Sequence, residues 1–551
     1  MQKLRTLSLL TALLSLLLFC SGCGKGDNPN AGAGHSFSYT LVGNPDTLDP
    51  QLAENASAKT VLANLFEGLL VLAPDGSIQN GVAESYTVSD DGLHYTFHLR
   101  DNCYWYNAFE DDKGFHDGDP VPVTADDFVF AFQRLFDPVY AAPMREAFYC
   151  IQYAKYASDG WTSPRKIGVT ANGAYELDFT LDYPNAGFPL LLTTTAALPC
   201  NQKYFESTKG RYGLDERSII GNGSFSVQRW LYDPYGKYNV IQMIRNPLNH
   251  AEHRVYPSDL NLYIEETDAD AAKIFTNGSA DCYVTTQSSI LQHADYSVKG
   301  TYSLTLGLIV NPESQYAESN ILTAMSLTLD RSKIKVNGDD IRTASGILPP
   351  GVTLLNKSCR ELIADAAYQK FDLEEADRVY HKGLRKLRIS EPDEGRILCC
   401  AGVMDYSVLR KALDEWQSEL DLHFAIEEVS EQEYERRLAD KDYDFALYAV
   451  TGPNQDASSF FSQLLADENF VCTQEGTVRE LIEQAASAAN RNDCVEIYRN
   501  AEAAILSDHC FIPLFYKQRY LVSKKGVSDV AFNPFSGQVQ FTEAKFNKEE
   551  S

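Results

Sequence analysis

Basic residues are scarce in this chain of 551 residues. Lys and Arg number 48 against 76 Asp and Glu, which gives a formal net charge of -28 at pH 7. Phosphate backbones bind proteins of the opposite sign, so this balance argues against nucleic acid as a partner. The acidic residues are spread along the chain rather than gathered into runs, and such charge favours solubility.

The commonest catalytic signatures are also missing. The sequence has no Gly-x-Ser-x-Gly nucleophile elbow and no His-Glu-x-x-His zinc motif, which removes two frequent signs of a hydrolase. Carboxylate pairs are unavoidable among 76 acidic residues, so they do not by themselves indicate a glycosidase. The histidines are scattered and the cysteines show no repeated metal-ligand interval. We therefore expect no catalysis, no cofactor and no metal ion, with an exported hydrolase as a remote alternative.

The N-terminal 23 residues resemble an export signal. Lys3 and Arg5 precede an apolar run over residues 7–19, which is too short to span a membrane. Ser21-Gly22-Cys23 is similar to a bacterial lipoprotein cleavage site, although Cys20 stands where leucine is usual. We expect a signal peptide over residues 1–22, lipidation of Cys23, and a flexible tether over residues 23–35. The other ten cysteines are widely spaced, and the sequence leaves their disulfide state open.

Residues 83–138 combine a strand pattern with a capped helix. Apolar and polar residues alternate from Leu93 to Arg100, a two-residue period that is typical of a half-buried strand. Thr124 is placed to cap a helix whose apolar residues share one face until Pro138 ends it. The same reasoning predicts a hairpin over 169–181, helices over 57–70 and 479–504, and a buried strand over 511–516.

Residues 396–450 have the order β-α-β-α-β. Strands are predicted over 397–400, 422–427 and 444–450, with a helix over 406–420 and another after the capping box of Ser430 and Glu433. This order calls for a mostly parallel sheet with right-handed crossovers. Such sheets bind ligands beyond the carboxyl ends of their strands. The rule points to the turn that follows Val450.

Several motifs, in their order and spacing, resemble extracytoplasmic solute-binding protein family 5, the oligopeptide- and dipeptide-binding lipoproteins of ABC importers. They are Thr47-Leu48-Asp49-Pro50, Leu99-Arg100-Asp101 with Trp105, Ile220-Gly221-Asn222-Gly223, Ile244-Arg245-Asn246-Pro247 and Asn277-Gly278-Ser279-Ala280-Asp281. The resemblance implies a two-lobed α/β fold of the periplasmic-binding type (type II, cluster C) with an extra domain inserted in the first lobe. It places lobe I at 36–80, 216–305 and 516–548, the extra domain at 81–215 and lobe II at 306–515.

The resemblance also implies where a ligand binds. The expected contacts lie on the turn after Val450 and on surfaces that face it: Thr451, Gly452, Asn454, Asp456, Leu48, Trp105, Tyr106 and Met144. Two alternatives stay open, since Trp105 and Tyr106 fit core packing equally well and Asp456 fits a helix cap. Pro453 stands where relatives usually have an aspartate for the α-ammonium of a peptide, and proline offers neither charge nor N–H. Either another acid takes that charge, or the ligand lacks a free amino terminus.

The resemblance implies a monomer, lipid-anchored to the outer face of the bacterial cytoplasmic membrane. It would capture a peptide or similar small solute between its lobes and deliver it to the permease subunits of an ABC importer. A peptide or pheromone sensor, or a chaperone-like binder, on the same fold is the alternative.

Overall fold

A computed structural model describes residues 34–109, 120–236, 238–250, 255–288, 295–331, 333–334, 336, 340–363, 371–467, 469–488 and 491–547. The expected signal peptide, the lipidation site at Cys23 and nearly all of the tether lie outside the described residues. Within those residues, no helix combines the length and the apolar character that crossing a membrane requires.

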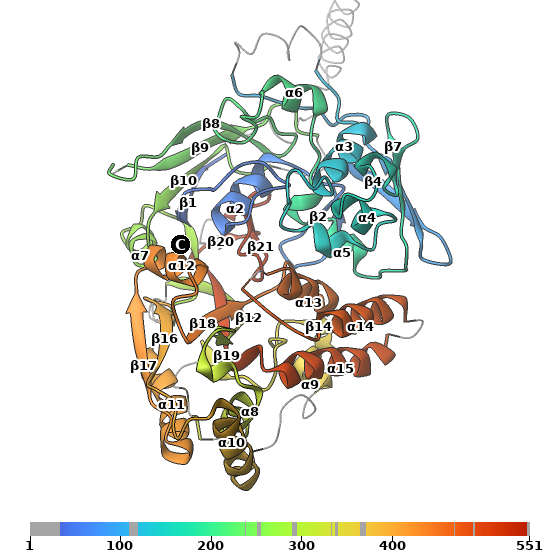
Figure 1. Ribbon diagram of the computed structural model, residues 1–551. Helices are drawn as coiled ribbons and strands as arrows, with labels where there is room; N and C mark the ends of the chain where they lie inside the picture. The colour runs from blue at the N-terminus through green and yellow to red at the C-terminus, as the bar shows by residue number, and fades with distance from the viewer. Residues whose placement is uncertain are drawn as a thin grey trace, which may run out of the picture.

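One sheet of 11 strands runs through the molecule (Figure 1). Its strands, in spatial order, are β17 (Phe424–Val429), β16 (Gly395–Cys400), β18 (Phe445–Val450), β12 (Tyr296–Val310), β19 (Phe511–Lys524), β11 (Cys282–Thr285), β1 (Ser36–Val42), β10 (Asp259–Glu265), β9 (Val240–Arg245) and β8 (Phe225–Leu231), with β13 (Ile341–Thr343) paired to β19.

The long strands β12 and β19 connect one hydrophobic core with two others. The end of β19 pairs with β11, beside a core built from residues before 285 and after 519. The end of β12 pairs with β18, between two cores drawn almost wholly from residues 306–515. The pairing of β12 with β19 shifts register between Tyr302 and Leu304, near the passage from one lobe to the other. The predicted two-lobed α/β fold is confirmed.

The predicted β-α-β-α-β order is present in the second lobe. Strand β16 pairs in parallel with both β17 and β18, and α11 (Tyr406–Leu420) and α12 (Glu431–Ala439) make the connections. The hydroxyl of Ser430 accepts a hydrogen bond from the amide of Glu433 and caps α12. Because the third strand ends at Val450, the chain leaves the sheet at the turn that the sequence singles out.

A separate sheet of four strands is formed between residues 83 and 180, within residues 81–215, the inserted segment. Its order is β4 (Ala83–Val88), β5 (His94–Leu99), β7 (Glu176–Thr180) and β6 (Val169–Ala171). Tyr95, Phe97 and Leu99 are buried and alternate with more exposed neighbours, as the two-residue period predicts. They pack in one core with α3 (Ala125–Leu135), whose first turn is closed by the capping box of Thr124 and Asp127.

Three predicted elements have different bounds. The helix predicted over 57–70 is α2 (Ala56–Leu65) and stops because Phe66 is extended. The helix predicted over 479–504 is two helices, α14 (Glu475–Ser487) and α15 (Asp493–Asp508), since Ala488 leaves the helical conformation. The buried strand predicted over 511–516 is the beginning of the longer β19.

The remaining elements surround these sheets. The α-helices are α4 (Ala154–Ser158), α5 (Phe188–Leu191), α6 (Gln202–Ser207), α7 (Asp268–Thr276), α8 (Ser319–Thr328), α9 (Cys359–Leu362), α10 (Leu373–Leu387) and α13 (Ala457–Ala466), and the 3-10 helices are η1 (Arg145–Phe148), η2 (Pro164–Lys166), η3 (Thr195–Ala197) and η5 (Gln315–Ala317). Short strand pairs are β2 (Leu70–Leu72) with β3 (Ile78–Asn80), β14 (Thr353–Leu354) with β15 (Lys357–Ser358), β20 (Val527–Ser528) with β23 (Lys545–Phe546), and β21 (Ala531–Phe532) with β22 (Val539–Gln540).

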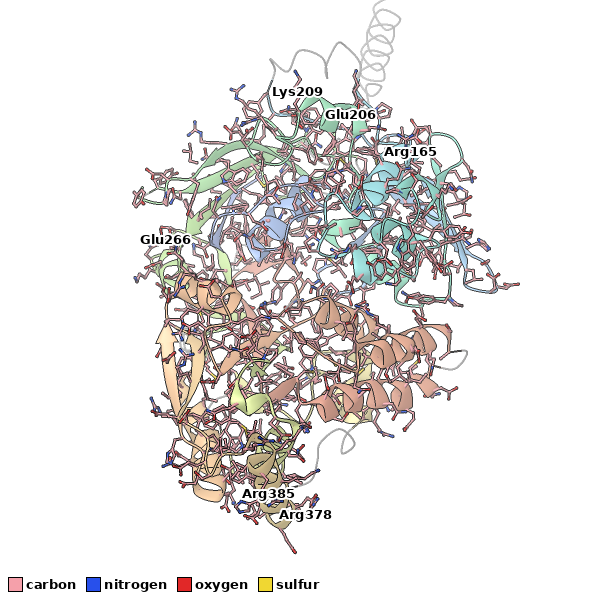
Figure 2. The ribbon with its side chains drawn as sticks, in the orientation of Figure 1. Arg165, Glu206, Lys209, Glu266, Arg378 and Arg385 are labelled. Atoms are coloured by element: carbon pink, nitrogen blue, oxygen red, sulfur yellow. The ribbon has the colours of Figure 1, made fainter. Side chains whose placement is uncertain are left out.

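Charged side chains lie at the outer ends of both lobes. In Figure 2, Glu206 and Lys209 lie at one end of the molecule and Arg378 and Arg385 of α10 at the other. These outlying charges agree with the dispersed acidic and basic residues of the sequence.

Candidate ligand-binding cleft

A cavity of ≈ 250 Å³ lies where the two lobes meet. Its lining comes from four stretches of the chain, residues 54–59, 144–195, 451–463 and 519–538: Glu54, Ala56, Lys59, Met144, Thr194, Thr195, Thr451, Gly452, Pro453, Gln463, Arg519, Asn533, Phe535, Ser536 and Gln538. A site shared in this way changes shape when the lobes move relative to each other.

The turn after β18 forms one wall and is tied down by hydrogen bonds. The hydroxyl of Thr451 lies 3.0 Å from the carbonyl oxygen of Ser303 and 3.2 Å from that of Phe535. The side-chain amide of Asn533 donates to the carbonyl of Pro453 at 3.0 Å. These contacts hold the turn against β12 and against the 533–538 loop.

Close packing favours glycine at position 452. A β-carbon there would lie 3.0 Å from the Cα of Phe460, at the start of α13. The turn therefore packs tightly on this helix, and without a side chain at position 452 its backbone lines the cavity directly.

The adjoining wall is the 533–538 loop, which is hydrogen-bonded to the turn and folded around the side chains of Asn533 and Arg519. The amides of Phe535 and Ser536 donate to the side-chain oxygen of Asn533 at 3.0 Å and 3.3 Å. The guanidinium of Arg519 donates to the carbonyls of Pro534, at 2.7 Å, and Phe535. Because these acceptors are backbone carbonyls, Arg519 positions the loop and keeps its own positive charge beside the cavity.

Two cations and one carboxylate set the electrostatics of the cavity. Burial lowers the pKa of Lys59 and lowers the pKa of the Arg519 guanidinium to about 10. Such shifts mark charges that have lost solvation without equal compensation. Glu54, an exposed residue, is the acidic side chain of the lining. The cavity therefore favours a ligand with an anionic group near Lys59 and Arg519.

Three of the predicted contacts line this cavity, namely Thr451, Gly452 and Met144. Asn454 and Asp456 lie behind the wall instead. Asn454 is 1% exposed, and its side-chain oxygen accepts from the amide of Asp456 at 2.8 Å. Its Nδ2 has no hydrogen-bond partner in the described part of the chain.

Asp456 caps helix α13, which is the alternative that the sequence left open. Its carboxylate accepts from the amide of Ser459 at 2.9 Å. It also reaches the inserted segment, because a β-carbon on Gly187 would lie 3.3 Å from its Cγ. Asp456 thus contributes to the contact between lobes rather than to the lining of the cavity.

The other three predicted contacts, Leu48, Trp105 and Tyr106, lie outside the lining of this cavity. Leu48 and Trp105 are 0% exposed and belong to the core of the first lobe. The indole N–H of Trp105 is satisfied by Asp127 at 3.1 Å, and the backbone of Tyr106 pairs with Gly221. Trp105 therefore follows the core-packing alternative, since burial beside an internal acceptor satisfies both its ring and its N–H. Tyr106 is half-buried.

The sequence did not identify Arg519, Lys59 or the 533–538 loop as parts of the site. Lys59 lies on the helix that follows the Thr47-Leu48-Asp49-Pro50 motif, so its position offered a local signal. The Asn-Pro-Phe-Ser-Gly run at 533–537 predicts a turn. Its packing against Thr451, 82 to 86 residues away in the chain, has no local signature.

Lys517 is a buried cation on the same strand as Arg519. It is 3% exposed, and its ammonium donates to the carbonyl of Val403. Burial lowers the pKa of Lys517 to about 8, against the opposing effect of Asp340 and Asp268. Between pH 8 and the unfolded value near 10.4, the unfolded chain binds more protons than the folded one, so stability rises with pH.

We expect the free energy of unfolding to increase by about 1 kcal/mol between pH 7 and pH 9 through Lys517. Urea denaturation of the parent chain and of Lys517→Met at both pH values measures it. The variant lacks the titrating group, so its pH dependence should be smaller by that amount. Equal pH dependence in the two proteins would contradict the assignment.

One cluster of metal-ligating side chains occurs in the described ranges. The ligand atoms of Cys472, Asp508 and Cys510 lie within 4.8 Å of one another. Both carboxylate oxygens of Asp508 already accept hydrogen bonds from Thr473. None of these residues lines the cavity.

Comparison with known proteins places this geometry in a family. The model of the bacterial extracellular solute-binding proteins, family 5, matches residues 77–471. The oligopeptide-binding protein OppA of Bacillus subtilis is 23% identical over 98% of this chain and 99% of its own. The probable deoxycholate-binding periplasmic protein YgiS of Escherichia coli is 24% identical over 87% of this chain and 88% of its own.

A solved structure has the same fold. The Haemophilus influenzae OppA complex with RPPGFSPFR superposes with a TM-score of 0.77 at 21% identity, covering 94% of this chain and 100% of that one. The family match spans more than half of the sequence, and the two-lobed architecture agrees with it. The chain belongs to the bacterial extracellular solute-binding proteins, family 5.

Proposed function

We propose that this protein captures a peptide or similar small solute between its lobes and delivers it to the permease of an ABC importer. The observation that carries the proposal is the cavity between the lobes, walled by the turn after β18 and by the 533–538 loop. A ligand that contacts the turn and also lining residues from other parts of the chain, such as Lys59 and Thr194, binds the closed form better than the open one and so shifts the population toward closure. The family consists of binding proteins, and we propose that the solute is released unaltered.

The chemistry of the walls supports a zwitterionic or anionic ligand. A carboxylate would bind near Lys59 and Arg519, where burial already disfavours the uncompensated charges. Glu54 is the acidic residue of the lining, and an α-ammonium would bind on its side of the cavity.

We propose that export and a lipid on Cys23 bring the protein to the outer face of the cytoplasmic membrane, where the permease lies. The leader pattern of residues 1–23 supports this placement. We also propose the division into lobe I (36–80, 216–305 and 516–548), an extra domain (81–215) and lobe II (306–515). The separate four-stranded sheet at 83–180 supports that division.

A thermal-shift screen with short peptides tests the function. Binding to the native state alone should stabilise the protein by about 2.7 kcal/mol at a ligand concentration of 100 Kd. Mass spectrometry of the peptide before and after incubation should show no cleavage. If a broad peptide panel leaves the melting temperature unchanged while a bile acid or another non-peptide solute raises it, the peptide assignment fails.

Pro453→Asp tests whether the missing carboxylate decides the amino-terminal preference. The new carboxylate would face the cavity from the position of Pro453 and should attract an α-ammonium. We expect free-amino peptides to gain about tenfold in affinity over their acetylated forms, roughly 1.4 kcal/mol. Titration calorimetry of the peptide pair measures the ratio, and Pro453→Ala serves as the control for losing the proline ring. An equal ratio in Pro453→Asp and Pro453→Ala would show that position 453 does not face the amino terminus.

A further inference from the structure

A second cavity, of ≈ 330 Å³, lies between the inserted segment and the second lobe. It is lined by Glu146, Tyr149, Lys155, Tyr156, Trp161, Asp182, Tyr183, Ser462, Arg479, Ile482 and Glu483. It shares no lining residue with the first cavity. In Figure 1, α4 and α5 of the inserted segment lie over α13 and α14 of the second lobe. We propose that this cavity binds an organic cation, through an ammonium or guanidinium group.

Aromatic faces at the mouth of the cavity are exposed. Trp161 is 74% exposed and Tyr156 49%, and their ring centroids are 5.7 Å apart. Large aromatic side chains gathered at a hollow are typical of binding sites. The ammonium of Lys155 already lies 5.4 Å from the ring centroid of Tyr149, within the range of a cation–π contact.

The charges around the cavity are predominantly negative. Lys155 pairs with Asp159 at 3.5 Å, and Arg479 pairs with Glu146 at 2.6 Å and Glu475 at 2.8 Å. These ion pairs occupy both cations of the lining. Asp182 and Glu483 add two more carboxylates, so five acids surround two bases.

The surroundings of the remaining acids favour an incoming cation. Burial raises the pKa of the Asp182 carboxyl, which shows that its charge is incompletely solvated. Burial also raises the pKa of Tyr183, and the charges of Glu483 and Asp182 raise it further. A cation seated between these carboxylates and the aromatic faces would relieve both effects.

The cavity is positioned to respond to closure of the lobes. Arg479 of α14 meets Glu146 of η1 across the boundary between the second lobe and the inserted segment. A cation bound here would contact both sides of that boundary. It could come from a free small molecule or from the basic side chain of a peptide held in the first cavity.

Titration calorimetry of the full chain with two capped amino acids tests the proposal. Nα-acetyl-arginine amide carries the guanidinium, and Nα-acetyl-citrulline amide is its neutral counterpart of nearly the same shape. We expect the arginine compound to bind at least about tenfold more tightly. Equal binding of the two compounds would overturn the proposal.

Variants locate the binding. Trp161→Ala should weaken the arginine compound by about tenfold and Glu483→Gln by about threefold. Glu480→Gln, an exposed change on the same helix outside the lining, should leave its affinity as in the parent chain. If Trp161→Ala and Glu483→Gln both bind it as the parent does, or if a change that fills the first cavity removes its binding, the second cavity is not the site.

Peptides distinguish the two sources of the cation. If Trp161→Ala weakens an arginine-containing peptide but not its citrulline form, the cation is the basic side chain of the transported ligand. If it weakens only the capped arginine, the site takes a free small cation. Both results support a cation site in the second cavity. The experiment with capped arginine and citrulline tests this site even if no peptide binds the first cavity.

Discussion

Ser536→Trp should abolish ligand binding in the first cavity while leaving the protein folded. Ser536 lines that cavity from the 533–538 loop. An indole at this position would fill much of a space of ≈ 250 Å³ and exclude the ligand that the walls are shaped to hold. We expect an affinity loss of at least about hundredfold, roughly 2.7 kcal/mol, by titration calorimetry with the best ligand of the peptide screen.

Two controls separate blocking from damage to the loop. Ser536→Ala removes only the hydroxyl that accepts from the amide of Gln538 at 3.3 Å, and its binding should fall by less than about tenfold. Ser85→Trp places the same ring on an exposed position of β4 and should bind as the parent does. Parent-like affinity in Ser536→Trp would show that the ligand binds elsewhere.

The elements that the sequence predicted correctly are those with a local signal. The two-residue alternation of Tyr95, Phe97 and Leu99 and the capping box of Ser430 and Glu433 depend on neighbours within a few positions. The rule that parallel strands place ligands beyond their carboxyl ends located Thr451 and Gly452 on the cavity. Local pattern and fold class were therefore enough to find one wall.

The other wall depends on contacts that sequence distance hides. Arg519 and Asn533 reach the site because β19 returns the end of the chain to the first lobe. Trp105 is the converse case, since the sequence pattern suggested a ligand contact and the side chain lies in the core. An aromatic residue next to a motif of a ligand-binding family can either line a cavity or lie in the core. Trp105 lies in the core, where Asp127 accepts a hydrogen bond from its indole N–H. Long-range packing decides whether such a residue lines a cavity or lies in the core, and it produces no periodic pattern in the sequence.

Glu502→Ala should cause the largest loss of stability that we expect in the second lobe. Glu502 is 0% exposed on α15, and its carboxylate accepts from the guanidinium of Arg360 at 2.8 Å and 2.9 Å. It also accepts from the amides of Ile347 and Leu348. The carbonyl of Ile347 in turn accepts from Thr305 of β12 at 2.7 Å. The carboxylate thus holds α15 to the central strand that connects the lobes.

Removing the carboxylate leaves the buried guanidinium of Arg360 without its counter-ion and two amides without an acceptor, so we expect a loss of about 3–5 kcal/mol. Urea unfolding followed through Trp416, which is buried in the same lobe, measures it. Glu496→Ala on the same helix breaks an exposed pair with Arg499 and should cost less than about 1 kcal/mol. Replacing both partners, as Arg360→Met with Glu502→Leu, should recover much of the loss, because no uncompensated charge then stays buried. A Glu502→Ala protein as stable as Glu496→Ala would mean that solvent reaches Arg360 and that the pair does not fasten α15 to β12.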